Sequence, residues 1–211
     1  MAFFVSFEGG EGSGKSTQAR VLYERLLQAN VPAVLTHEPG GTALGDKARR
    51  LLKRSQQAEI SPIAELFLIV ASRAQLVTEV IRPSLDSGAV VVCDRYADST
   101  VAYQGYGRGI DMDFVHAVNR VATQGVFPQL VVLLDMPIEA GLTRKGTVAR
   151  DRFEAESAEF HQRVREGYVR MASADPQRWL VLDATLPKRE ISRRIWDRVA
   201  EMLSGEGRKA V

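Results

Sequence analysis

The chain has 211 residues, of which 45% are hydrophobic, and this length can form one compact domain with a sizeable core. Its 28 basic and 26 acidic residues leave a net charge of only +2 and include no run of five or more Lys or Arg, so we expect no nucleic-acid partner. The sequence has no apolar stretch near the ~20 residues of a membrane span, no signal-peptide pattern and one cysteine, Cys93, so we expect a cytoplasmic protein without membrane association or disulfides.

Short β-branched runs alternate along the chain with longer segments of helical periodicity. The strand candidates are residues 3–8, 33–37, 90–94, 130–135 and 179–183. Each is nearly continuous in apolar residues, which is typical of strands buried on both faces of a parallel sheet. Apolar stripes predict helices around residues 19–27, 66–81, 114–122, 160–171 and 191–203. The alternation predicts a single α/β domain over residues 1–211, with a five-stranded parallel sheet and helices on both faces.

The first predicted strand is followed by a match to the P-loop pattern G-x-x-x-x-G-K-[ST]. The matching residues are Gly9, Gly10, Glu11, Gly12, Ser13, Gly14, Lys15 and Ser16. In such a loop, backbone N–H groups and the N-terminus of the next helix hold phosphates. The lysine adds a mobile cation, and the hydroxyl is placed to ligate Mg²⁺. We therefore expect a nucleoside triphosphate and Mg²⁺ to bind here, in a P-loop NTPase-type fold.

An arginine lies on the apolar stripe of the second long helix. Arg73 shares this stripe with Ile69 and is expected to face inward. Because a buried guanidinium without a partner is costly, Glu65, another carboxylate or a ligand must pair with it. The position alone does not decide among the three.

Charged residues follow the third predicted strand, at the edge of the sheet where ligands bind in such folds. Asp94 is a candidate partner of Mg²⁺ there. Arg95 can hold the phosphate of an acceptor through two parallel hydrogen bonds. An Asp-Arg pair can also be a surface ion pair, but the position at the end of a strand favours a ligand.

The segment GLTRKGTVARDRFE, residues 141–154, concentrates basic residues in a loop before a helix. Such a segment can close over a triphosphate and bring charge to the transferring phosphoryl group. A solvated basic loop is the alternative for this segment alone. With the P-loop and Arg95, it favours a lid at about residues 142–154.

Three classes of P-loop protein are open to this chain: GTPase switches, nucleotide-driven machines and small-molecule kinases. The sequence contains no Asn-Lys-x-Asp guanine-binding motif and no additional interaction segment. A kinase needs anion-binding sites for the phosphates of two substrates and a cover that excludes water. The arginines above meet that need. We therefore expect a kinase for a small phosphorylated acceptor.

The whole chain resembles the bacterial thymidylate kinases, P-loop enzymes that make dTDP from dTMP and ATP for dTTP biosynthesis. The resemblance rests on the segments FEGGEGSGKST, HEPGGT, ASRAQL, CDRYADSTVAYQG, DRFE and VLDA. It implies ATP and Mg²⁺ as cofactors, dTMP as the substrate, a cytoplasmic location and a homodimer.

The resemblance also implies individual roles. ATP is expected on Gly9, Gly10, Glu11, Gly12, Ser13, Gly14, Lys15, Ser16, Thr17 and Arg144, with Mg²⁺ on Ser16 and Asp94. The acceptor is expected on Glu11, Glu38, Pro39, Arg49, Ile69, Arg73, Arg95, Ser99, Thr100, Tyr103 and Gln104. Catalysis is expected from Lys15, Arg95, Arg150 and Arg152. One class of the family has an arginine in the P-loop; because this chain has Gly12 there, the arginines of the lid must serve instead.

One position departs from the family pattern. A phenylalanine that stacks on thymine usually precedes the helix arginine by four residues, and this chain has Ile69 there. Isoleucine covers a base by dispersion but loses a stacking contribution on the order of 1–3 kcal/mol. Phe67, the nearest aromatic residue, lies on a different helical face. Another nucleoside monophosphate kinase, with Ile69 indicating a different base, is therefore one alternative. A protein of another class, an ATP-dependent switch without kinase activity, is the second.

Overall fold

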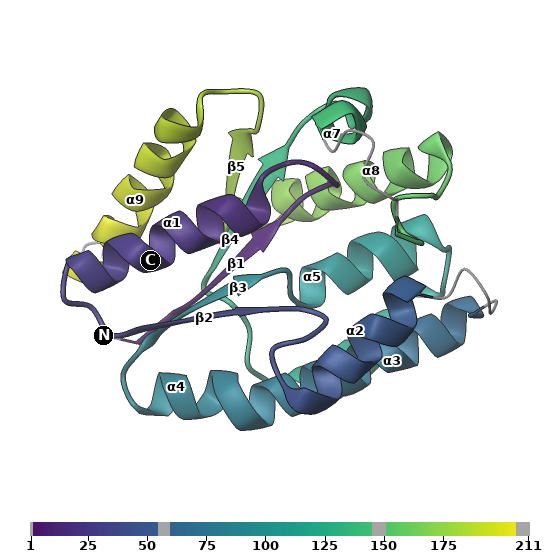
Figure 1. The fold of residues 1–211 in the computed structure, drawn as a ribbon, viewed down its shortest axis with the longest axis horizontal. Coiled ribbons are helices and arrows are strands. Elements are labelled where there is room, and N and C mark those ends of the chain that lie inside the picture. Colours follow the sequence, from purple (N-terminus) through teal and green to yellow (C-terminus); the bar gives the residue numbers. More distant parts are fainter. Residues whose placement is uncertain (1, 55–59, 145–150, 206–211) are drawn as a thin grey trace.

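The computed structural model describes residues 2–54, 60–144 and 151–205. Among these residues, five strands form one sheet in the order β2-β3-β1-β4-β5, and all neighbouring strands are parallel (Figure 1). The strands are β1 (Phe4–Glu8), β2 (Ala33–His37), β3 (Val90–Asp94), β4 (Leu130–Asp135) and β5 (Trp179–Asp183). The predicted α/β fold is confirmed, and only β1 departs from its predicted bounds, by beginning one residue later.

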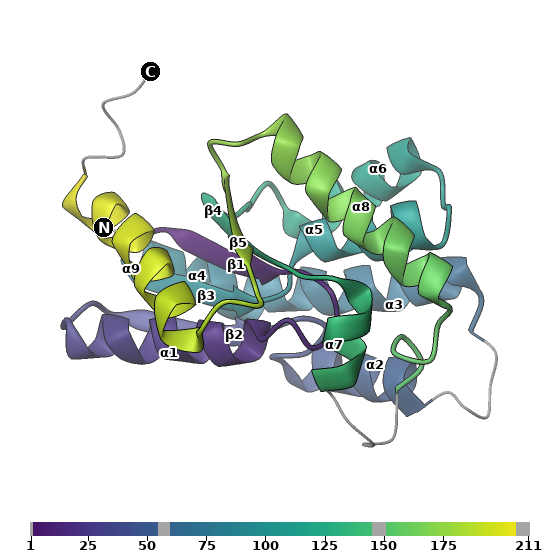
Figure 2. The same cartoon turned by 90° about the horizontal axis from the view of Figure 1, so that it is seen from above.

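Helices cover both faces of the sheet, as the sequence predicted (Figure 2). They are α1 (Lys15–Gln28), α2 (Ala43–Arg54), α3 (Pro62–Leu76), η2 (Val77–Ile81), α4 (Arg82–Asp86), α5 (Ala97–Thr100), η3 (Val101–Gly107), α6 (Met112–Thr123), α7 (Ile138–Arg144), α8 (Ala158–Ala174) and α9 (Lys188–Ser204). The helices α1 and α9 pack on one face, whereas η2, η3 and α8 pack on the other. Within the described part of the chain, every helix is too short or too polar to cross a membrane.

The central strand shows why its sequence is apolar throughout. Successive side chains of a strand point to opposite faces. Val5 and Phe7 therefore pack with α1 and α9, while Phe4 packs with η2 on the other side. All three side chains are fully buried, and each contributes roughly 1.5–3 kcal/mol of hydrophobic stabilisation.

The described residues include two π-helices that the sequence pattern did not indicate, η2 and η3. The stripe over residues 66–81 becomes α3 followed by η2, and most of the glycine-rich run of residues 105–109 belongs to η3. A glycine is required in η3 because α8 passes close to it: a Cβ on Gly107 would lie 2.6 Å from the ring of Phe160. Tyr103 and Gln104 lie on η3 and reach the site described below.

The strand register brings distant segments together at one edge of the sheet. Asp94 at the end of β3 is paired with Phe7 of β1 on one side and His37 of β2 on the other. The P-loop follows β1, and Glu38 follows β2, joined to β3 by its N–H bond to the carbonyl of Asp94 at 3.0 Å. This edge therefore holds the P-loop, Glu38 and Asp94 as immediate neighbours.

Candidate active site

A cavity of about 410 Å³ opens at the carboxyl ends of β1 and β3. Its walls come from the P-loop, from the segments after β2 and β3, from α2, α3 and η3, and from residues 151–154. Every residue that the sequence assigned to the acceptor lines this cavity, from Glu11 in the P-loop to Gln104 in η3. Of the residues assigned to ATP, Glu11, Gly12, Gly14, Lys15, Ser16 and Thr17 line it, whereas Gly9, Gly10, Ser13 and Arg144 lie outside its lining.

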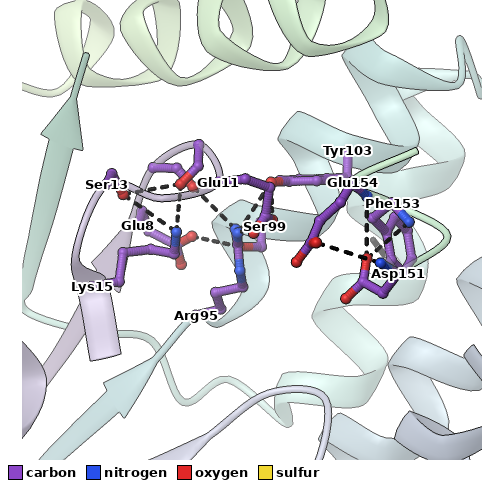
Figure 3. A network of polar contacts seen from close by, with 12 residues as sticks. Glu8, Glu11, Ser13, Lys15, Arg95, Ser99, Tyr103, Asp151, Phe153 and Glu154 are labelled. Atoms are coloured by element: carbon purple, nitrogen blue, oxygen red, sulfur yellow. Dashed lines mark hydrogen bonds and ion pairs between the residues drawn. The ribbon is translucent and has the colours of Figure 1, made fainter. Parts of the chain in front are cut away.

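The P-loop lysine folds back over its own loop (Figure 3). Lys15 Nζ donates to the carbonyl of Gly10 at 2.6 Å and to Ser13 Oγ at 3.3 Å. Burial, followed by the neighbouring charge of Arg95, lowers the pKa of Lys15 to about 8. The preceding Gly14 has φ = 92°, in the left-handed region that glycine adopts most readily. Burial and a second positive charge disfavour the lysine ammonium in this loop, so an anion that binds beside it is stabilised.

Two oxygen ligands suited to Mg²⁺ meet at the start of α1. Ser16 Oγ donates a short hydrogen bond to Asp94 Oδ2. Asp94 Oδ1 is buried, and no hydrogen-bond partner for it exists among the described residues. Mg²⁺ prefers hard oxygen ligands and keeps several sites for phosphate and water. The pair therefore fits the metal that the sequence predicted there.

The Arg95 guanidinium lies at the centre of a hydrogen-bond network (Figure 3). Its Nη2 donates to Glu11 Oε1 at 2.6 Å and to Tyr103 Oη at 3.0 Å. Its Nη1 donates to the carbonyl of Gly9 at 3.1 Å and to Tyr168 Oη at 3.2 Å. The backbone of Arg95 has φ = 71°, which is uncommon for a residue with a side chain. This geometry turns the guanidinium from the end of β3 toward the P-loop.

A buried carboxylate that the sequence pattern did not single out shares two hydrogen-bond partners, Ser99 and Tyr168, with Arg95. Glu8 is fully buried and accepts hydrogen bonds from the N–H of Tyr96, from Ser99 Oγ and from Tyr168 Oη. Burial, and secondarily the charge of Asp98, raises its pKa to about 7. Its signal in the sequence was a charged residue within a strand predicted to be buried on both faces.

Arg73 faces inward, as predicted, and its partner is another carboxylate, not Glu65. Its Nε and Nη2 donate to Glu38 Oε2 at 2.8 and 2.7 Å, and both side chains are almost fully buried. Nη1 donates to Asn119 Oδ1, and Nη2 also donates to Thr100 Oγ1 at 2.9 Å. Arg73 still lines the cavity, so its protein partners fix the guanidinium group and leave part of it accessible from the cavity.

The arginines assigned to the lid lie in different surroundings. Arg144, at the end of α7, donates to the carbonyl of Ala184 at 2.8 Å, in the loop after β5. Arg152 does not line the cavity and forms a short ion pair with Glu65. Arg150 lies outside the described residues.

The end of the lid segment nevertheless contributes a wall of the site. Asp151, Phe153 and Glu154 line the cavity. The ring of Phe153 packs edge-on against Tyr103, with 6.0 Å between their centroids. The DRFE segment stands out in the sequence for its arginine, whereas the aromatic contact of Phe153 could not be predicted because it depends on η3 being a helix.

Comparison with known proteins identifies the family. The family model described as Thymidylate kinase matches residues 7–195. The chain belongs to the thymidylate kinase family. It is 53% identical over 203 residues to the thymidylate kinase of Dehalococcoides mccartyi, covering 96% of this chain and 98% of that one, and 45% identical to that of Desulfovibrio desulfuricans, covering 97% and 98%. The crystal structure of thymidylate kinase from Ehrlichia chaffeensis is similar, with a TM-score of 0.76, 32% identity and coverage of 94% and 98%.

The fold explains why this member of the thymidylate kinase family has a glycine at position 12. Gly12 has φ = 71°, and a Cβ there would lie 2.1 Å from the carbonyl oxygen of Gly141 in α7. In turn, a Cβ on Gly141 would lie 2.3 Å from the carbonyl oxygen of Glu11. The P-loop and α7 thus meet backbone to backbone, which leaves no room for the P-loop arginine that one class of the thymidylate kinase family carries.

Ile69 holds the position where the resemblance led us to expect a phenylalanine that stacks on thymine. Ile69 lines the cavity and is nearly buried. Phe67 points elsewhere: half of it is exposed, and its ring packs edge-on against Phe114. In this thymidylate kinase family member, an aliphatic side chain therefore forms the wall at the position where the resemblance led us to expect an aromatic ring.

Proposed function

We propose that the chain transfers the γ-phosphoryl group of ATP to the phosphate of dTMP, forming dTDP and ADP in the biosynthesis of dTTP. The main support is that one cavity contains both a P-loop with its lysine and two arginine side chains, Arg73 and Arg95, from the acceptor side. A nucleotide switch needs only the first of these. A kinase for a phosphorylated acceptor needs both.

The chemistry follows from charge, not from proton abstraction. A phosphate oxygen of dTMP attacks the γ-phosphorus of ATP, and the bond to the β–γ bridging oxygen breaks to release ADP. The attacking oxygen is already anionic, so no strong general base is needed. The main obstacle is repulsion between two polyanions, which Lys15 and Arg95 offset. Residues 151–154 form part of the wall that limits access of water.

We assign the metal to the start of α1. Ser16 and Asp94 would hold Mg²⁺, directly or through water, and the metal would supply neutralisation of the phosphate charge. Asp94 Oδ1 supports this assignment, because it is buried and has no hydrogen-bond partner in the part of the chain that the structure describes. Ser16 keeps Asp94 oriented through its hydrogen bond.

We assign the phosphate and sugar of the acceptor to the side of the cavity near Arg95. The acceptor phosphate takes the place of Glu11 on Arg95, aided by Arg49 from α2. Tyr103 crowds the 2′ position of the sugar and so favours deoxyribose. Ser99 continues this wall.

We assign the base to the wall formed by α3 and η3. The Arg73 fork, which Glu38 orients, directs its remaining Nη1–H to the thymine carbonyl. Ile69 and Pro39 pack on the ring, and Thr100 and Gln104 complete its edge.

We assign the lid to about residues 142–154 of a single catalytic unit spanning residues 1–211. Arg144 lies beside the loop after β5 and is assigned to ATP. Arg150 and Arg152 are assigned to the transferring phosphoryl group. Arg152 reaches it only by exchanging its ion pair with Glu65 for the phosphate.

We further propose a cytoplasmic homodimer. Its support is an exposed apolar patch on α3 and α6, made of Ile63, Phe67, Phe114 and Val121, of which Val121 is 79% exposed. Such a patch favours a protein interface, and the same patch on a second copy is self-complementary. Sedimentation of the wild type and of Val121→Asp tests this: the wild type should sediment as a dimer and the variant as a monomer.

The deciding experiment for the function is ADP production from ATP and Mg²⁺ with dTMP, dUMP, dCMP, dGMP and AMP tested side by side. Strong turnover with dTMP alone is the expected result. Turnover with a different acceptor would keep the kinase chemistry and overturn the substrate. Slow hydrolysis that no acceptor stimulates would instead indicate a nucleotide switch.

A further inference from the structure

A buried carboxylate lies directly behind the proposed base-binding wall. Glu65, in the first turn of α3, is 0% exposed and does not line the cavity. Its Oε1 accepts from Gln104 Nε2 at 2.8 Å and from Arg108 Nε at 3.2 Å. Its Oε2 accepts from Arg108 Nη2 at 3.1 Å and from Arg152 Nη2 at a shorter distance.

The two guanidinium groups determine the chemical character of this carboxylate. A buried carboxylate is stable as an anion only when opposite charges pair with it and hydrogen bonds satisfy its oxygens. Arg108 and Arg152 meet both conditions for Glu65. If Arg152 moves toward a substrate, Glu65 remains paired with Arg108. An ionised carboxylate can only accept hydrogen bonds.

The orientation of the Gln104 amide follows from this. The oxygen and nitrogen of a glutamine side chain are told apart by their hydrogen-bond partners. Because Glu65 only accepts, Gln104 must direct its NH₂ group to Glu65. Its carbonyl oxygen is then the group that it offers to the cavity, which it lines. The cavity that Arg73 lines as a donor thus also presents a hydrogen-bond acceptor.

We propose that Glu65 is a positioning residue for base selection: it holds Gln104 with its carbonyl oxygen toward the acceptor base and so favours thymine over cytosine. This proposal rests on the proposed function. Thymine offers a carbonyl at C4 and an N–H at N3, which match Arg73 and the Gln104 oxygen. Cytosine offers an amine at C4 and an acceptor at N3, so both pairs become mismatched, and buried polar groups without partners are costly.

The substitution Glu65→Gln tests the proposal. The introduced glutamine has one acceptor and one donor end. Arg108 and Arg152 attract its oxygen, so its NH₂ group faces Gln104 and forces that amide to turn over. The cavity then presents N–H groups at this position. We expect the ratio of kcat/KM for dTMP to that for dCMP to fall by about tenfold or more, as for the loss of one well-formed hydrogen bond.

Two controls separate this effect from a loosened pocket. Thymine and uracil share the same hydrogen-bonding edge and differ only in a methyl group, so the dTMP to dUMP ratio should not change in Glu65→Gln. Glu156→Gln removes the other carboxylate partner of Arg108, whose Nη1 lies 2.6 Å from Glu156 Oε1. Among the described residues no hydrogen bond or ion pair joins Glu156 to Gln104, so this variant should keep the wild-type dTMP to dCMP ratio.

A charge swap provides a rescue. In the double variant Glu65→Gln with Gln104→Glu, the new carboxylate accepts from the new amide and again turns an acceptor oxygen to the cavity. On a logarithmic scale, the ratio of kcat/KM for dTMP to that for dCMP should regain at least half of its loss. A merely structural role of Glu65 does not predict this recovery. An unchanged ratio in Glu65→Gln, or equal loss for dTMP, dUMP and dCMP without rescue, would overturn the proposal. A wild type that does not prefer dTMP over dCMP would instead refute the proposed function.

Discussion

Arg95 Nη2 lies 2.6 Å from Glu11 Oε1, so an ion pair joins the end of β3 to the P-loop. Both side chains line the cavity, and both are only about one-sixth exposed. In the proposed function the acceptor phosphate, which is also an anion, competes with Glu11 for the same guanidinium. The ion pair with Glu11 would then hold Arg95 in place until the phosphate replaces the carboxylate.

Loss of this arginine should affect the acceptor far more than ATP. We expect Arg95→Ala to lower kcat/KM for dTMP by at least about thirtyfold, since truncation of one member of a buried charge pair costs about 2–5 kcal/mol. The KM for ATP should change by less than about threefold. Steady-state kinetics with each substrate varied in turn measures both values. Arg20→Ala, at an exposed position of α1, is the matched control, and equal losses for both substrates would contradict the assignment.

The P-loop lysine should make ATP use sensitive to mildly alkaline pH. The pKa of Lys15 is lowered to about 8, and only the protonated form attracts phosphate. Because kcat/KM reports the free enzyme, kcat/KM for ATP should be level below about pH 8 and fall as pH rises through that value. Bound phosphates favour the ammonium, so kcat should fall at higher pH. Lys15→Ala should abolish turnover with an unchanged circular dichroism spectrum, and near-normal kcat in it would refute the role.

The contact between the P-loop and α7 predicts an unusual response to a small side chain. Alanine is normally better than glycine within a helix, by roughly 0.5–1 kcal/mol. In Gly141→Ala, however, the added Cβ would lie 2.3 Å from the carbonyl oxygen of Glu11. We expect the P-loop to shift and KM for ATP to rise about tenfold, with Tm unchanged or lower. Glu139→Ala, at an exposed position of the same helix, should leave KM for ATP unchanged.

Glu8 should make the stability of the fold depend on pH. Burial is the main cause that raises the pKa of its carboxyl group from 4.5 to about 7 in the folded protein. Between these values the folded state binds the extra proton, so the free energy of unfolding contributed by Glu8 falls as pH rises and is fully lost above pH 7. The loss is on the order of 3 kcal/mol.

The isosteric variant isolates this effect. In Glu8→Gln nothing titrates at this position, so the stability difference between variant and wild type should shift in favour of the variant from pH 4.5 to 7. Urea unfolding at a series of pH values measures the difference. Glu159→Gln, at an exposed position of α8, is the control. Parallel profiles for Glu8→Gln and the wild type would show that Glu8 does not titrate in this range.

The strands and the P-loop could be predicted from the sequence because their signals are local. An apolar run such as residues 130–135 must be buried on both faces, and a strand followed by Gly9 to Ser16 and a helix leaves few alternatives for what it binds. The positions of Arg95 and Asp94 followed from one further rule, that ligands bind at the carboxyl ends of parallel strands. The residues of the acceptor site came from the family resemblance, and the fold gathers them in one cavity.

Only the tertiary structure decided which charges meet. The helical stripe predicted that Arg73 is buried, but its partner Glu38 is 35 positions away in sequence, and Glu65, which lies eight positions away, pairs with Arg108 and Arg152 instead. The helical form of η3 and the contact of Gly12 with Gly141 could not be predicted from the sequence either. The spacing of apolar residues shows which face of a helix or strand is buried, because the side chains on one face recur with the period of that helix or strand. The partner of a buried charge is chosen by the packing of whole elements, since it depends on the distance between side chains and not on their order along the chain.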